Sequence, residues 1–301
     1  MIKKLSKLTM IMLLLGTLLV GSAVACQSQV EGEDGEYGDW SVNWNDYRPV
    51  VKPPQETDPQ PPVDESPDDN EGGTTVTPPS ELTPAIKPAT YTAMIKSATN
   101  SLKVRSAPST SGQILGTLDK GDMVRYEGKQ NGWYKTVYKE KTAYIYAGNN
   151  YASVVYMKQG SKAVENIIAV GEELLGYPYV WGSQRYHWGN GTINTSFIPG
   201  QFDCSALMQY MFYKGAGVLM ALNTRTQVLQ GEEVALADMQ RGDVMFFTNE
   251  SRYNNTGVER VGHVALYLGD NYILHTASDH AVIEEISAKR WSYFIVAKRF
   301  I

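Results

Sequence analysis

The chain has very little cysteine: Cys26 and Cys204 are the only two among 301 residues. A framework of several disulfides, which supports many small exported domains, is therefore excluded. Histidine is scarce as well, with four residues. The few thiols and imidazoles are the candidates for reactive groups, and the rest of the sequence decides between them.

Two other absences bear on partners. The uncharged apolar run at 8–20 is too short and wrongly flanked for a membrane span. No dense cluster of lysine and arginine suggests nucleic acid, and we expect no nucleic-acid partner. Residues 82–301 carry 22 Lys and Arg against 18 Asp and Glu, a charge of about +4. This mildly basic balance suits an anionic wall or membrane environment.

The N-terminus is typical of an export signal. Three lysines precede the apolar run, and small residues at 21–25 precede Cys26. We therefore predict a signal peptide over residues 1–25. The small residues before Cys26 resemble a bacterial lipoprotein cleavage box, whereas Ala23-Val24-Ala25 also fits an ordinary signal peptidase. We favour lipidation of Cys26, which predicts an exported protein of the bacterial cell envelope with a lipid anchor in the membrane.

Residues 26–88 are predicted to form an acidic, proline-rich, disordered tether. Between Glu31 and Glu81 there are fourteen Asp and Glu against two basic residues, and eleven of the fourteen prolines lie between Pro49 and Pro88. Low hydrophobicity, negative charge and proline together oppose a packed core. The net charge of −5 of the whole chain therefore belongs to this segment.

Residues 89–158 are rich in short β-type segments that glycines separate. These segments are 102–105, 113–115, 123–126, 133–138 and 143–146. Many short strands with no helix between them indicate a small all-β barrel. The stretches that resemble a bacterial SH3 domain are 102–108, 120–122 and 131–135. This resemblance implies a module that binds the wall or positions a substrate.

Cys204 stands at the predicted start of a helix that continues to about Gly215. Asp203 is a good N-cap, so Cys204 would lie in the first turn, where free backbone N–H groups and the helix dipole favour a thiolate. A lone cysteine is more often a small buried apolar residue, and this segment alone leaves the two interpretations balanced. If Cys26 is lipidated, Cys204 has no intrachain disulfide partner and is a candidate reactive thiol.

Two of the four histidines fall in predicted strands at 261–268 and 272–276. A three-residue loop at 268–270 would place His263 opposite His275 on one face, with Cβ atoms about 4.5–5.5 Å apart. A two-residue loop would shift the register by one and separate them. A helix-start cysteine, a histidine and a second polar ring together form a nucleophile, a base and an orienting group.

At these residues the chain resembles the NlpC/P60 family of cell-wall cysteine peptidases. The matching motifs are Tyr-Val-Trp-Gly at 179–182, Asp-Cys-Ser at 203–205, Arg-Gly-Asp-Val-Met-Phe-Phe at 241–247, the segment 262–269 and His275. The ordered set is far more specific than any one motif. It implies a papain-like α+β catalytic domain over 160–301, which we expect to begin with a helix from Ser161 to Leu175.

The resemblance also implies the roles of the site residues. The implied catalytic residues are Cys204 (nucleophile), His263 (general base, then acid) and His275 (orienting third member). The implied substrate-binding residues, which would hold a free amino end, are Tyr179, Asp203 and Ser205. The implied reaction is hydrolysis of the γ-D-glutamyl–diamino acid bond in peptidoglycan stem peptides, with no metal and no other cofactor. We expect a monomer.

Some departures from the family pattern surround the site. Ser183 stands where a second glycine is usual, and it removes no reacting group. Insertions near 183–200 and 249–259 should lie near the cleft, where they either restrict the substrates or are harmless surface loops. We expect His187 and His280 to be surface residues outside catalysis.

Two alternatives to a peptidase stay open. In the first, the protein is a catalytically inactive scaffold that binds the wall. In the second, its thiol performs amidase or acyl-transfer chemistry on wall peptides. The joint presence of Cys204, His263 and His275 argues against the scaffold, and the identity of the bond that is cut distinguishes the peptidase from the other enzymes.

Overall fold

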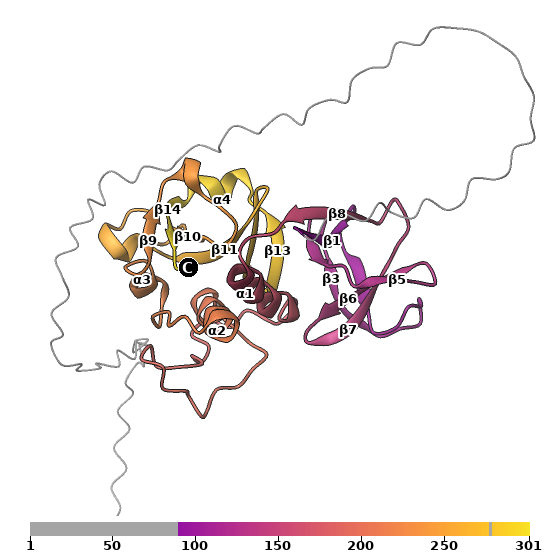
Figure 1. Cartoon of the computed structure of the whole chain (residues 1–301), viewed down its shortest axis with the longest axis horizontal. Coiled ribbons are helices and arrows are strands. Elements are labelled where there is room, and N and C mark those ends of the chain that lie inside the picture. The colour runs from indigo at the N-terminus through magenta and orange to yellow at the C-terminus, as the bar shows by residue number, and fades with distance from the viewer. Residues whose placement is uncertain (1–89, 277–278) are drawn as a thin grey trace, which may run out of the picture. The chain divides into compact units, whose positions relative to one another are not determined.

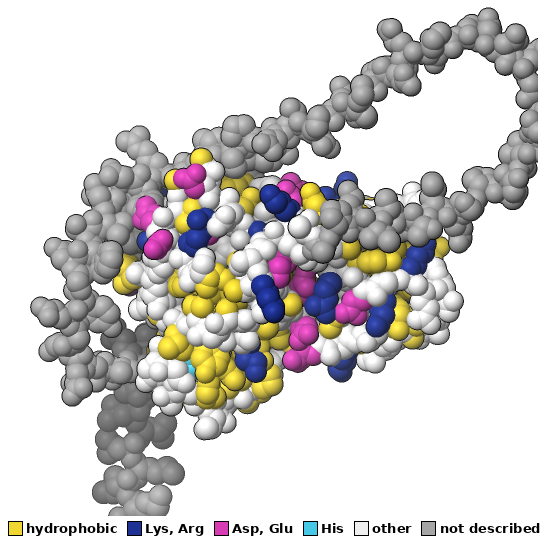
Figure 2. Space-filling view, viewed as in Figure 1, with side chains coloured by type: hydrophobic (Ala, Val, Ile, Leu, Met, Phe, Trp, Pro, Cys, Tyr) yellow, Lys and Arg dark blue, Asp and Glu magenta, His cyan; other side chains and the backbone are white. Residues whose placement is uncertain are grey.

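The computed structural model describes residues 90–276 and 279–301, which all lie within one compact unit (Figure 1). The predicted signal peptide (1–25), the lipidation of Cys26 and the predicted tether (26–88) lie outside the described residues. Among the residues that are described, no helix is long and apolar enough to cross a membrane. On the face in Figure 2, lysine and arginine are interspersed with aspartate and glutamate.

Eight strands precede the first helix and form two antiparallel sheets, of order β4-β1-β8 and β3-β2-β7-β6-β5 (Figure 1). They are β1 (Tyr91–Ser97), β2 (Leu102–Arg105), β3 (Ile114–Leu118), β4 (Met123–Arg125), β5 (Gly128–Gln130), β6 (Trp133–Tyr138), β7 (Lys141–Tyr146) and β8 (Ala152–Lys158). Alternate side chains such as Val104 and Ile145 are fully buried between the sheets. The predicted all-β segment is confirmed.

The rest of the described chain is built on a six-stranded antiparallel sheet of order β13-β12-β11-β10-β14-β9. Its strands are β9 (Glu232–Val234), β10 (Val244–Phe247), β11 (His263–Gly269), β12 (Tyr272–Thr276), β13 (Ala281–Glu285) and β14 (Phe294–Arg299). The helices are α1 (Lys162–Glu173), α2 (Cys204–Ala216), α3 (Thr224–Gln227) and α4 (Ala288–Ser292), with 3₁₀ turns at Leu236–Asp238 and Gly257–Arg260. Separate helices and an antiparallel sheet give the predicted α+β class.

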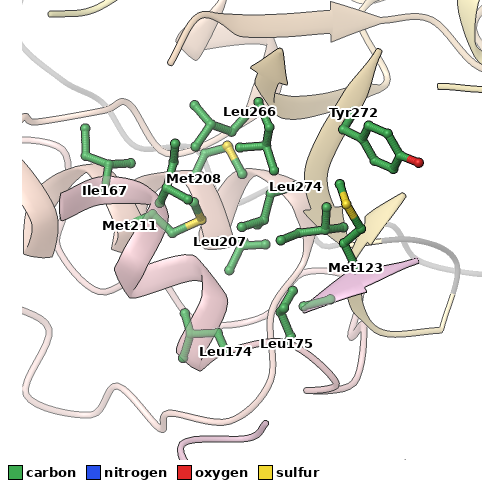
Figure 3. Close-up of a cluster of buried hydrophobic side chains, with 14 of the residues drawn as sticks. Met123, Ile167, Leu174, Leu175, Leu207, Met208, Met211, Leu266, Tyr272 and Leu274 are labelled. Atoms are coloured by element: carbon green, nitrogen blue, oxygen red, sulfur yellow. The ribbon is translucent and has the colours of Figure 1, made fainter. Parts of the chain in front are cut away.

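Each face of this sheet has its own core. Toward α1 and α2 point Val244, Phe246, Val264, Leu266 and Leu274, whereas Met245, Phe247, Ala265 and Ile273 pack with Trp291 of α4. Figure 3 shows α2 between the sheet and α1, with Leu207, Met208 and Met211 among the buried side chains. Because α2 is buried on most sides, its first residue is held at a fixed depth against β11.

Both long helices begin after capping residues that are recognisable in the sequence. Ser161 caps α1, its Oγ accepting a hydrogen bond from the Val164 N–H at 3.3 Å. Asp203 caps α2, with Oδ1 accepting from the Ala206 N–H at 2.8 Å. A Cβ at Gly215 would lie 2.5 Å from the Ile167 Cα, so the glycine allows α1 and α2 to approach closely. Cys204 is therefore the first residue of α2, as predicted.

The predicted register of the histidine hairpin is wrong by two residues. Leu266 pairs with Leu274, which places Ala265 rather than His263 opposite His275. The loop has two residues with positive φ, Asp270 and Asn271, and the register shifts again between Tyr267 and Gly269. The two-residue loop moves the pairing by three residues relative to the prediction, and the irregularity moves it back by one. The side-chain faces are thus preserved, and His263 lies diagonally across from His275.

Glu172 of α1 is a buried carboxyl group next to β4. Its Oε2 accepts from Arg125 Nη1 at 3.4 Å, and Oε1 has no hydrogen-bond partner among the described residues. Burial raises the pKa of Glu172 from 4.5 to about 7, against the charges of Arg125 and Arg241. Because this folded-state pKa lies above the unfolded value, the stability that protonated Glu172 contributes is present below pH 4.5. It is lost as the pH rises through 7.

Replacing Glu172 by glutamine is expected to stabilise the fold at pH 8 by up to about 3 kcal/mol. The amide keeps the shape of the protonated acid but carries no charge to desolvate. Thermal unfolding at pH 4.5 and pH 8 measures the effect, and the gain in Tm should appear only at pH 8. Glu173→Gln, at the exposed neighbouring position, is the control. An equal dependence of Tm on pH in Glu172→Gln and the unmodified chain would contradict the assignment.

Candidate active site

Cys204 is a buried free thiol, 7% exposed. Its sulfur faces the backbone N–H groups of Val264 and Ser205. Burial, followed by the charge of Asp203, raises the pKa of the Cys204 thiol to about 12, although these N–H groups and Arg185 oppose the rise. The expected thiolate at the helix start is therefore not the resting state. Desolvation outweighs the helix N-terminus, so the sulfur needs a base that removes its proton.

His263 and His275 form a hydrogen-bonded pair. His263 is the first residue of β11 and His275 lies in β12, and 2.8 Å separates His263 Nε2 from His275 Nδ1. His263 is half-buried, whereas His275 is fully buried. Burial lowers the pKa of both imidazoles below 6.5, that of His263 well below it. Both rings are therefore neutral at pH 7, and His263 is able to accept a proton.

Glu284 extends this pair to a chain of three, which the sequence did not predict. His275 Nε2 lies 2.9 Å from Glu284 Oε1 on the adjacent strand β13. Arg290 of α4 lies 3.7 Å from the same oxygen. Burial raises the pKa of Glu284, but His275 and Arg290 outweigh it and leave the carboxyl ionised. The only hint in the sequence was one acidic residue directly after the apolar run Ala281–Ile283, and no motif contains it.

The Glu284 carboxylate determines which imidazole nitrogens of His275 and His263 carry protons. Ionised Glu284 accepts only, so His275 donates its Nε2–H to it and keeps a lone pair on Nδ1. His263 then donates its Nε2–H to that lone pair. The lone pair on His263 Nδ1 is left as the basic site of the chain. This is the tautomer in which His263 is able to take a proton from a thiol.

Tyr179 and Asp203 lie beside the thiol. Tyr179 forms a β-bridge with Phe202, two residues before Cys204. Burial and the charges of Cys204 and Asp203 raise the pKa of the Tyr179 hydroxyl. Asp203 Oδ1 accepts from Ser205 Oγ at 2.9 Å as well as from the cap N–H. The structure thus brings the three predicted substrate-binding residues and Cys204 together at the start of α2.

The insertion at 183–200 folds onto this same end of α2. Ser183 Oγ accepts from the Asp203 N–H at 2.7 Å, so the serine that replaces a glycine supports the N-cap. Arg185 Nη1 donates to Asp203 Oδ2 at 2.9 Å. Phe197 stacks on Tyr210 of α2, with ring centroids 5.6 Å apart. The insertion is therefore attached to the site rather than being a loose surface loop.

The two other histidines are not members of this hydrogen-bonded chain, although the charge of His280 acts on both His275 and Glu284. The expectation that His187 is a surface residue is wrong, because it is fully buried with its ring 5.0 Å from that of Tyr213. His280 is partly exposed and pairs with Asp279 at 2.8 Å. Over residues 90–276 and 279–301, no three His, Cys, Asp or Glu side chains are grouped as in a metal site.

Comparison with known proteins finds a family match in each half of the described chain. Residues 176–299 match the model of the NlpC/P60 family, and residues 100–149 match that of the bacterial SH3 domain. The gamma-D-glutamyl-L-lysine dipeptidyl-peptidase of Bacillus subtilis is 30% identical over 168 residues, 55% of this chain and 48% of the relative. The peptidoglycan DL-endopeptidase CwlO of Bacillus licheniformis is 29% identical over 145 residues, 47% of this chain and 29% of the relative.

Among solved structures, an NLP/P60 family protein of Staphylococcus aureus, described as similar to a lipoprotein, is 27% identical. The match covers 48% of this chain and 43% of that one, with a TM-score of 0.37. The chain spans half or less of the length of these relatives. Residues 176–299 nevertheless form an NlpC/P60 domain, and residues 100–149 form a bacterial SH3 domain that precedes it.

Proposed function

We propose that the protein is an exported cysteine peptidase that hydrolyses the γ-D-glutamyl–diamino acid bond of peptidoglycan stem peptides. The observation that carries this proposal is the hydrogen-bonded chain His263–His275–Glu284, which starts next to Val264, the residue whose backbone N–H faces the Cys204 sulfur. A base that is neutral at pH 7 and oriented by a carboxylate suits a thiol of high pKa. The names of the two Bacillus relatives support the wall-peptide substrate.

The first half of the reaction forms an acyl-enzyme. His263 Nδ1 takes the proton of the Cys204 thiol as the sulfur attacks the scissile carbonyl carbon. The oxyanion faces the backbone N–H groups of the first turn of α2, where the helix dipole favours negative charge. The tetrahedral intermediate then expels the amine of the diamino acid, which takes the proton from His263. A thioester between Cys204 and the glutamyl side-chain carbonyl remains.

The second half regenerates the enzyme. His263 takes a proton from water as the water oxygen attacks the thioester, and the Cys204 sulfur leaves and recovers that proton. In both halves His263 passes through an imidazolium ion, which the neutral His275 and the ionised Glu284 stabilise through their hydrogen bonds. Tyr179 and Ser205 bind the substrate beside the sulfur.

Digestion of isolated muropeptides by the full chain tests the proposal, with the products identified by mass spectrometry. We expect fragments that end in D-glutamate and fragments that begin with the diamino acid. Products cut between the glycan and the first amino acid would show an amidase instead, and transfer products would show an acyltransferase. No cleavage of any bond would favour the wall-binding scaffold.

The location of the protein is part of the same proposal. The signal peptide at 1–25 would export the chain, a lipid on Cys26 would attach it to the membrane, and residues 26–88 would tether the folded part to that anchor. Labelling with radioactive palmitate tests the anchor: we expect the unmodified chain to label and Cys26→Ala not to. A labelled Cys26→Ala variant would contradict it.

A further inference from the structure

Arg185 reaches from the insertion at 183–200 into the predicted substrate-binding residues. Its Nη1 donates to Asp203 Oδ2 at 2.9 Å and to the Ser183 carbonyl at 2.7 Å, and its Nη2 donates to Ser205 Oγ at 3.1 Å. Nε donates to the Leu222 carbonyl. Four of the five guanidinium N–H bonds thus have partners among the described residues, which fixes the planar group in one orientation.

The guanidinium lies within the site, next to the reacting group. The side chains of Arg185 and Asp203 are only 15% and 8% exposed, so solvent screens their ion pair weakly. The positive charge of Arg185 also acts on two neighbours, since it opposes the rise in the pKa of Cys204 and of Tyr179. Because Arg185 also hydrogen-bonds Asp203 and Ser205, on either side of Cys204, its guanidinium lies close to the thiol and the Tyr179 hydroxyl.

An unpaired carboxylate at Asp203 would attract the ammonium group of a free amino end. Here one oxygen of Asp203 is occupied by the cap N–H and by Ser205, and the other by Arg185. The negative charge is already compensated, and an ammonium group entering beside Tyr179 would meet a guanidinium. A neutral amide meets no such repulsion, and its carbonyl oxygen is an acceptor for the remaining N–H of Nη2.

We propose that Arg185 makes the subsite formed by Tyr179, Asp203 and Ser205 select peptides whose amino end is blocked as an amide and reject peptides with a free amino end. This proposal rests on the proposed function. The substrate class is then a stem peptide that is still acylated at its first residue. The predicted role of Asp203 changes accordingly: it holds Arg185 in place instead of contacting the substrate ammonium. Ser205 and Tyr179 keep their positions beside the substrate.

Binding to the Cys204→Ala form of the full chain tests this selection without relying on catalysis. The probes are two synthetic tripeptides, L-Ala-γ-D-Glu-L-Lys with a free amino end and the same peptide acetylated at that end. By calorimetry we expect the acetylated peptide to bind at least about tenfold more tightly. Its amide accepts a hydrogen bond from the charged guanidinium, whereas the ammonium group of the other peptide is repelled, and gaining or losing one charged interaction commonly changes affinity by this factor. Tighter binding of the free-amine peptide, or binding of neither, overturns the proposal.

A variant separates Arg185 from other causes of the preference. In Arg185→Gln the Asp203 carboxylate is uncompensated, and we expect the preference to shift toward the free-amine peptide by about tenfold or more. Lys162→Gln removes an equal charge at the exposed start of α1 and should leave the preference unchanged. Arg185→Lys keeps the charge and should keep the preference for the acetylated peptide. An unchanged preference in a folded Arg185→Gln protein contradicts the role of Arg185.

The same peptides distinguish failure of this inference from failure of the proposed function. If the acetylated peptide binds preferentially but neither peptide is cleaved by the unmodified chain, the peptidase proposal fails and the selection by Arg185 stands. If both are cleaved and the free-amine peptide has the higher kcat/KM, the peptidase proposal stands and the selection fails. The binding preference of the Cys204→Ala form, in which Arg185 is intact, decides the matter even where Arg185→Gln does not fold.

Discussion

Cys204→Ser is expected to lower kcat/KM for muropeptide cleavage by about four orders of magnitude or more. A serine hydroxyl at this position is buried as the thiol is, beside the Asp203 carboxylate, and it is a much weaker acid than a thiol. His263 has a low pKa, so it removes the proton of a serine hydroxyl even less readily than that of the thiol. The substitution changes one atom, so Tm should change little.

His263→Ala should have an effect of the same size, because the proton of Cys204 then has no acceptor. The matched control is His280→Ala, which removes an imidazole that pairs with Asp279 outside the hydrogen-bonded chain. It should retain most of the activity. Cleavage rates and thermal unfolding of all three variants give the comparison. Full activity in either Cys204→Ser or His263→Ala would overturn the assignment of nucleophile and base.

Local sequence rules accounted for the parts of the site that depend on neighbouring residues. Asp203 as a cap and the apolar run after it placed Cys204 in the first turn of α2. The same rules located α1 between Ser161 and Gly176. Such features depend on hydrogen bonds and burial within one or two turns, so they are visible in a short stretch of sequence.

The hairpin shows where these rules fail. Side-chain alternation correctly put His263 and His275 on one face, but the register was wrong because a two-residue loop and an irregularity before Gly269 act together. Each change alone would have separated the histidines, and their sum preserves the face. The pattern of apolar residues strongly specifies which side chains share a face of a strand. It does not distinguish registers that differ by two residues, because these keep the same face.

The charges at the site could not be read from the sequence at all. The pKa of Cys204 depends on its burial against Val264 and on the carboxylate of Asp203, both fixed by packing. Arg185 lies 18 residues from Asp203 and Glu284 lies nine residues from His275 along the chain. No local periodicity connects such residues, and they meet only when the insertion and β13 are in place.

Glu284→Gln is expected to lower kcat by about tenfold or more while preserving most of the fold. The amide oxygen of glutamine is able to accept the His275 Nε2–H, so the tautomers are kept, but the negative charge that stabilises the imidazolium is lost. Glu284→Ala should cost more activity and also stability, because it leaves a buried N–H without an acceptor. The exposed neighbour Glu285, which accepts from Asn271 Nδ2 at 3.1 Å, supplies the control Glu285→Gln.

The pH profile separates an electrostatic role of Glu284 from simple packing. Ionised Glu284 raises the pKa of His275 against the larger lowering by burial. Without that charge the histidine pair protonates only at lower pH, so its neutral, active form persists further into acid. We therefore expect the acid limb of kcat/KM to move to lower pH in Glu284→Gln and to stay in place in Glu285→Gln. An unmoved acid limb in Glu284→Gln, together with a lower Tm, would mean that Glu284 only packs against His275.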